Sequence, residues 1–103
     1  MKYQIWYMRP EWFPDGTFGR LPDPQNLAKT HVHLLEWETE KGISDVWYAM
    51  QAENWSPNGE ARELIESRGL AHTSMSVGDV IVDDVGNAHV VASLGFRAIG
   101  GVR

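Results

Sequence analysis

The sequence predicts a single α+β domain, in which a mainly antiparallel sheet of about five strands carries two helices on one face. Three observations favour this class. Segments of alternating apolar and polar side chains stand at both ends of the chain, two helical patterns lie between them, and no linker or repeat divides residues 1–103. A chain of 103 residues with 43 % hydrophobic side chains also has the size and polarity of one domain with one core.

The first strand is expected over residues 2–8, where Tyr3, Ile5 and Tyr7 recur at every second position. A long connection is expected over residues 9–29, because four of the five prolines and two glycines fall there without any period. Connections of this length in a compact domain are usually functional or mobile.

A second strand is expected from His31 to Glu38, because β-branched and aromatic side chains alternate with polar ones. Regular alternation would place His31, His33, Leu35 and Trp37 on one face of this strand. The two histidines are therefore expected to lie side by side.

The first helix is expected around residues 43–50. Ile43, Val46, Trp47 and Met50 recur at the spacing of one helical face, so we assign all four to the core. Ser44 is the expected N-cap of this helix.

A second helix is expected to begin at Ser56 and Pro57, since serine is a favoured N-cap and proline is favoured at the first helical position. Gly69 followed by Leu70 predicts a helix that ends in a Schellman motif.

The last third of the sequence predicts three short strands, over residues 80–84, 88–93 and 94–99. A hairpin is expected at Val85-Gly86-Asn87, where glycine permits the chain to reverse. Residues 100–103 are expected to form a frayed tail, because two glycines begin it.

Composition excludes several classes of function. The chain contains no cysteine, which excludes disulfide scaffolds and thiolate chemistry, and its net charge of −5 disfavours binding to a nucleic-acid backbone. No glycine-rich phosphate motif is present, so we expect no nucleotide cofactor. The amino terminus lacks a signal sequence and no apolar run is long enough to cross a membrane, so we expect a cytoplasmic protein.

The histidines give one catalytic hypothesis. His31 and His33 have a spacing compatible with a metal site, whose third ligand would be another histidine or a carboxylate such as Asp79. Residues 72–79 also bring hydroxyls, a histidine and an aspartate together, so a metal-dependent or serine/aspartate hydrolase is one alternative. The competing interpretation is structural, with ordinary hydrogen bonds at the histidines and a tight turn in which Asp79 binds local amides.

The aromatic side chains of the long connection give a binding hypothesis. Trp12, Phe13 and Phe18 lie there beside Arg9 and Arg20. Such side chains either pin a loop to the domain or present a binding surface. As a surface, Trp12, Phe13, Phe18 and Arg20 would bind a protein partner, and aromatics with arginines would also suit single-stranded nucleic acid.

Residues 74–81, Ser-Met-Ser-Val-Gly-Asp-Val-Ile, followed by a Gly-Phe pair, resemble the YodL-like domain family over about residues 54–99. The family usually has arginine where this chain has Thr73. The positions that carry the resemblance are Ser74, Ser76, Gly78, Asp79, Gly95 and Phe96.

This resemblance implies a domain of bacterial phage, plasmid and other mobile-element proteins that acts by binding and has no assigned enzymatic activity. We therefore expect a non-enzymatic protein-binding module without a cofactor. The hydrolase that uses His31, His33 and Asp79 and the nucleic-acid-binding module remain the alternatives.

Overall fold

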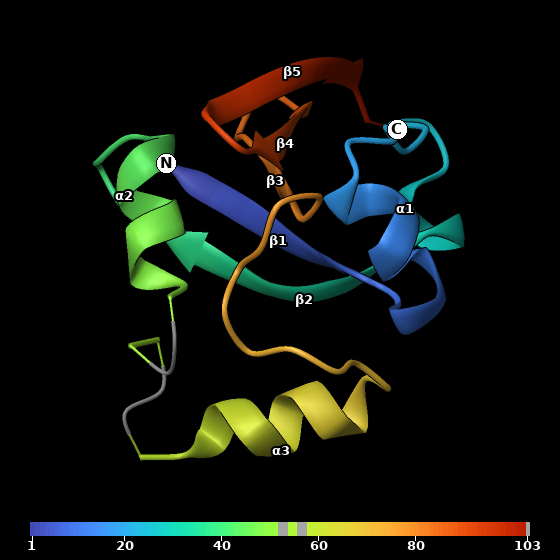
Figure 1. The fold of residues 1–103 in the computed structure, drawn as a ribbon. Helices are drawn as coiled ribbons and strands as arrows, with labels where there is room; N and C mark the ends of the chain where they lie inside the picture. The colour runs from blue at the N-terminus through green and yellow to red at the C-terminus, as the bar shows by residue number, and fades with distance from the viewer. Residues whose placement is uncertain (52–53, 56–57, 103) are drawn as a thin grey trace.

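A computed structural model describes residues 1–51, 54–55 and 58–102 as one α+β domain (Figure 1). The five strands form one antiparallel sheet with the order β2-β1-β3-β4-β5, which confirms the predicted class and sheet. The elements in chain order are β1 (Lys2–Met8), the 3₁₀ turn η1 (Pro10–Trp12), α1 (Phe13–Thr17), the 3₁₀ turn η2 (Leu27–Lys29), β2 (His31–Glu38), α2 (Ile43–Ala49), α3 (Glu60–Ser67), β3 (Val80–Val82), β4 (Asn87–Ala92) and β5 (Gly95–Gly101).

One face of the sheet packs against the two predicted helices. Its core combines Tyr3, Ile5 and Tyr7 of β1 with Val46 of α2 and Ile65 of α3. Burial of these side chains stabilises the fold at about 25 cal/mol for each Å² of apolar surface removed from water. In Figure 1 the segment that follows α3 runs back across β2 and β1 before it enters β3.

The opposite face carries a smaller core of Val80, Val82 and Ala88, which Leu27 of η2 and the partly buried Val102 cover. The 9–29 connection therefore contributes to the core through its 3₁₀ turn η2. It also holds the short helix α1, which the sequence did not predict.

The prediction that the chain frays from Gly100 onward is wrong for Gly100 and Gly101. Strand β5 continues to Gly101, and the Val102 backbone N–H donates a hydrogen bond to the Gly86 carbonyl oxygen at 2.7 Å. This bond joins the end of the described chain to the neighbouring hairpin.

A bulge in β2 changes which of its residues face the helix-covered core. His33 lies opposite Trp6 and Leu35 lies opposite Ile5, so Leu34 is an extra residue on β2. Regular alternation predicts Leu35 and Trp37 on the same face as His33, and this prediction is wrong. After the bulge, Leu35 packs against the helix-covered core instead.

The helix predicted over residues 43–50 is present as α2, but its buried stripe is narrower than predicted. Val46 and Met50 are fully buried, whereas the side chain of Trp47 is 37 % exposed. The N-cap is Gly42, which makes no side-chain capping bond, and Ser44 lies within the helix. Assignment of Trp47 to the core is therefore wrong, because this flank of α2 faces an open groove rather than another element.

The Schellman ending predicted for the second helix is confirmed at the end of α3. Gly69 has a φ of +68°, its N–H bonds to the Glu66 carbonyl, and the Leu70 N–H bonds to the Ile65 carbonyl. The predicted N-cap at Ser56 and Pro57 lies outside the described residues.

The predicted hairpin between β3 and β4 is confirmed, with Gly86 at a φ of +88°. The strand predicted over residues 80–84 ends at Val82, because Asp83 and Asp84 belong to the turn. Among the residues that the structure describes, no helix has the length and apolar character needed to cross a bilayer.

Close packing between α1 and the start of β3 gives a first testable prediction. Gly78 has a φ of +101°, and a methyl group on it would lie 2.9 Å from the Gly16 carbonyl carbon and closer still to Met8 Sδ. Gly78→Ala should lower the free energy of unfolding, measured in urea, by more than the ~1–2 kcal/mol cost of the left-handed conformation alone.

The matched control is Gly19→Ala. Gly19 has a φ of +95° but no atom within 4 Å of the added methyl group, so only the conformational cost applies. Equal losses in the two variants would show that the close approach of Gly16 and Gly78 does not exist in solution.

Candidate functional site

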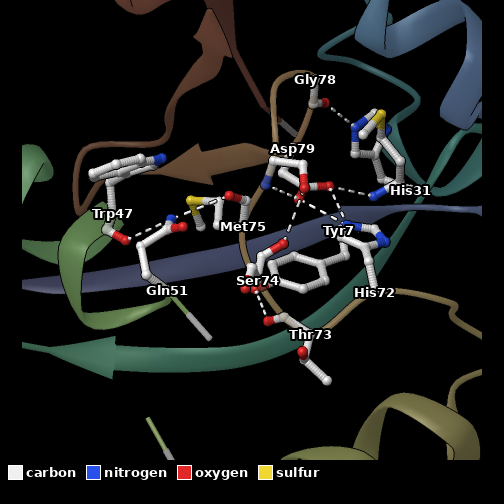
Figure 2. Close-up of polar contacts among 12 residues, drawn as sticks. Tyr7, His31, Trp47, Gln51, His72, Thr73, Ser74, Met75, Gly78 and Asp79 are labelled. Atoms are coloured by element: carbon white, nitrogen blue, oxygen red, sulfur yellow. Dashed lines mark hydrogen bonds and ion pairs between the residues drawn. The ribbon is translucent and has the colours of Figure 1, made fainter. Parts of the chain in front are cut away.

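A buried carboxylate lies where β1 ends and β3 begins. Asp79 has no exposed surface, and its Oδ1 accepts a hydrogen bond of 2.8 Å from the Met8 backbone N–H. Its Oδ2 accepts hydrogen bonds from the Ser76 N–H at 2.8 Å and from His72 Nε2 at 2.9 Å (Figure 2). Together with Tyr7, His31 and His72 it forms what we call the Asp79 cluster.

His72 is held in the Asp79 cluster by aromatic contacts as well. Its ring stacks on Tyr7 with a centroid distance of 4.6 Å and an interplanar angle of 9°, and Phe13 meets it edge-on at 5.0 Å. The Tyr7 hydroxyl donates to the Thr73 carbonyl oxygen at 2.7 Å. Burial, with a smaller contribution from the Asp79 charge, raises the pKa of Tyr7 far above its usual value, so this phenol stays protonated.

His31 is fully buried and uses both ring nitrogens. Nε2 donates to the Gly78 carbonyl oxygen at 2.8 Å, so in the neutral ring Nδ1 accepts from the Thr30 hydroxyl at 2.7 Å. Burial lowers the pKa of His31, and the bond to Gly78 and the charge of Asp79 only partly oppose this effect. The ring is therefore a neutral structural link between β2 and the turn before β3.

The hydrogen bonds of the Asp79 cluster agree with the interpretation of residues 72–79 as a structural turn. Both oxygens of Asp79 bind backbone amides, as the turn interpretation requires, although one amide belongs to the distant strand β1. Ser76 donates its hydroxyl to the Ser74 carbonyl oxygen at 3.1 Å. Gly78 has positive φ and fits closely against Gly16.

The candidate metal ligands do not assemble into a site. Among the described residues, no group of three histidine, cysteine or acidic side chains is placed to hold a metal ion. His33 packs edge-on against Trp6 at 5.3 Å, while His89 donates from Nε2 to Asp83 at 3.0 Å. Of the four histidines, His31 and His72 lie in one place, the Asp79 cluster, where His31 bonds to the Gly78 carbonyl oxygen and His72 bonds to Asp79.

The aromatic side chains of the 9–29 connection divide into two groups. Trp12 and Phe13 are half-buried, and the Arg20 guanidinium lies over the Trp12 ring, 5.2 Å from its centroid. The edge-on contact of Phe13 with His72 attaches the start of α1 to the rest of the domain, whereas the Arg20–Trp12 contact lies within the connection. Phe18 is 93 % exposed and is the aromatic side chain of this set that faces solvent.

A groove of about 810 Å³ lies between α2 and the hairpin formed by β4 and β5. Tyr48 is 70 % exposed beside the half-exposed Trp47, and no pattern in the sequence had singled out Tyr48. We call this feature the aromatic groove, and the lining residues that matter below are Asp45, Trp47, Tyr48, Val77, Val91 and Phe96.

Gly95 and Phe96, which contribute to the family resemblance, lie at the groove. Gly95, the first residue of β5, has a φ of +87°, and the partly buried Phe96 packs against the helix-covered core. The signal that could have located the groove is Tyr48, an aromatic residue adjacent to the apolar stripe of α2 but not part of it.

Comparisons with protein-family models, with curated proteins and with solved structures find no match. The resemblance to YodL-like domains therefore stays a prediction.

The Asp79 cluster gives a second testable prediction. Asp79→Asn replaces one acceptor oxygen by a donor and leaves a buried amide unpaired, so it should lower the free energy of unfolding in urea by about 3 kcal/mol. Asp83→Asn is the control, since Asp83 also accepts from two turn amides but is partly exposed, and it should cost about 1 kcal/mol. If Asp79→Asn leaves the free energy of unfolding unchanged, Asp79 has no structural role and is again a candidate catalytic residue.

The buried neutral His31 gives a third prediction. The pKa of His31 in the folded protein lies below the ordinary value of 6.5. Between these two pKa values the imidazole is protonated in the unfolded chain and neutral in the folded chain. The free energy of unfolding should therefore fall below about pH 6.5, by at most ~1.4 kcal/mol for each pH unit, until the pH passes below the folded pKa.

Urea unfolding between about pH 8 and pH 5 measures this effect. His31→Gln should give a flatter profile, because glutamine does not titrate while the charged and titratable neighbours Asp79, His72 and Arg9 remain. Parallel profiles for the two proteins would show that another group causes the acid sensitivity.

Proposed function

We propose that this chain is a non-enzymatic protein-binding module and that the aromatic groove is its binding surface. The observation that carries the proposal is the groove of about 810 Å³, lined by Trp47 and Tyr48, which expose 37 % and 70 % of their surface. Aromatic side chains are enriched at protein interfaces, where they supply large contact areas at low entropic cost.

The wall of the groove is held in place before any partner binds. The Met75 N–H donates to the Met50 carbonyl oxygen at 3.1 Å, and Gln51 Nε2 donates to the carbonyl oxygens of both Trp47 and Met75 (Figure 2). These bonds fix α2 to the segment before β3. A preformed wall lowers the ordering cost of binding.

Exposed apolar side chains continue around the hairpin tip. Leu94 is 95 % exposed at that tip, and a second cavity of about 240 Å³ is lined by Phe18, Leu21 and Arg97. The two cavities share Val77 and residues 91–93. Contiguous exposed apolar surface marks interaction sites. We therefore include Phe18, one of the binding residues predicted in the 9–29 connection, in the proposed surface.

The two alternative functions have less support. Catalysis by His31 and Asp79 would require groups that are free to react, but both side chains are saturated by structural hydrogen bonds. Nucleic-acid binding would require free arginines, but Arg9 donates to the Ala28 carbonyl oxygen and Arg20 lies on Trp12. The mobile-element setting and the cytoplasmic location rest on sequence alone and remain part of the proposal.

Selection from a displayed library of random peptides tests the binding surface. Peptides enriched on the wild-type protein should bind Tyr48→Ser about tenfold more weakly, because truncation of an interface aromatic typically costs over 1 kcal/mol. Val85→Ser is the control, since Val85 is also an exposed apolar residue but lies in the β3–β4 turn. Peptides that bind Tyr48→Ser and the wild type equally would contradict the proposal.

A further inference from the structure

We propose that the partner of the aromatic groove is an extended, positively charged peptide segment that adds a strand to the free edge of β5. This inference rests on the proposed function and specifies its ligand. A cationic side chain of the peptide would lie between the groove aromatics and Asp45.

The first support is the edge itself. Strand β5 pairs with β4 on one side, and no described strand pairs with its other side. Proteins usually protect such an edge with proline, several charged side chains or a cover. Strand β5 has three glycines, one charged side chain in Arg97 and no proline. Its unpaired backbone groups are therefore accessible to another extended chain.

The second support is the register of the edge. Pairing between β4 and β5 is continuous from Ala92 and Gly95 to His89 and Ala98, and the irregularity falls beyond this point, at Ile99. A bulge distorts an edge and discourages pairing. The regular part of the edge is thus the part beside the groove, where Phe96 lies.

The third support is the pair of cavities on opposite faces of β5. Phe96 lies opposite Val91, which belongs to the helix-covered core, and lines the aromatic groove. Arg97 lies opposite Val90, which belongs to the other core, and lines the second cavity. Because side chains of a strand alternate, an added strand would direct every second side chain into the groove.

The charge of the groove selects the peptide. Asp45 is the charged side chain in its lining, and within the described part of the chain its carboxylate makes no ion pair or hydrogen bond. An arginine or lysine beside Asp45 would also gain cation–π attraction from Trp47 and Tyr48. A second copy of this chain is a poorer occupant, since two chains of net charge −5 repel each other.

Fluorescence polarisation with labelled peptides of about eight residues, the length of a strand, tests the charge requirement. A peptide that alternates arginine with threonine should bind, and its counterpart with glutamate in place of arginine should bind about tenfold more weakly or not at all. Asp45→Asn should weaken the arginine peptide about threefold, as expected for a partly exposed ion pair. Glu63→Gln, the same change of charge on the exposed surface of α3, should not.

N-methylation tests the strand addition. Methyl groups on alternate amides of the arginine peptide, placed in the register that faces β5, should weaken binding about tenfold because the backbone donors are lost. Methyl groups in the other register should have little effect. Hydrogen exchange at Phe96 and Ala98 should slow on binding. Equal effects of both registers, or unchanged exchange, would overturn strand addition.

The outcomes separate this inference from the proposed function. If library peptides that depend on Tyr48 prove to be acidic or helical, the binding function stands and the basic extended ligand is wrong. If sedimentation shows concentration-dependent dimers that Asp45→Asn strengthens, a second copy occupies the groove and the inference is also wrong. If no peptide depends on Tyr48, the proposed function fails first.

Discussion

The interaction on which the rest of the fold depends is the set of hydrogen bonds to Asp79. Its carboxylate accepts from the backbone of Met8, the last residue of β1, and from Ser76 in the segment that crosses the sheet. Charged acceptors make hydrogen bonds about twice as strong as neutral ones, and more so where water is excluded. The bonds position His72 against Tyr7 and bring Gly78 within reach of His31. The aromatic groove depends on the same segment, because Val77 and Ser76 form part of its lining.

Much of the fold could be predicted from local patterns. Positions in β1, the Schellman end of α3 and the Gly86 hairpin follow from periodicity and turn chemistry that act over a few residues. The bulge at Leu34 could not, because only the pairing of β2 with β1 reveals the extra residue. Likewise the stripe of α2 indicated a helix correctly, yet whether Trp47 is covered depends on which elements lie beside it.

The candidate site was harder to predict for the same reason. The pattern of residues 72–79 offers a turn with Asp79 on local amides as one of two interpretations, but it cannot reveal the bond to Met8, which lies 71 residues away. The aromatic groove brings together Tyr48 of α2 and Phe96 of β5, which lie far apart in the sequence. Of the aromatic side chains in the 9–29 connection, Phe13 packs edge-on against His72 and Trp12 lies against the Arg20 guanidinium. Spatial assembly, rather than residue type, decided which aromatics stayed exposed.

The central position of β1 has a consequence for how the chain acquires its structure. β1 comes first in chain order among the five strands, yet it lies between β2 and β3 and pairs with residues 80–82 on one side. Contacts of such long sequence separation slow folding, because the entropy of closing a long loop is lost before they form. During synthesis β1 therefore lacks one of its two neighbouring strands until residues 80–82, in the last quarter of the 103 residues, have been made. Until then Ile5 and Tyr7 lack the core side chains that follow α3, such as Met75 and Ile81, and incompletely buried apolar surface favours aggregation of a nascent chain.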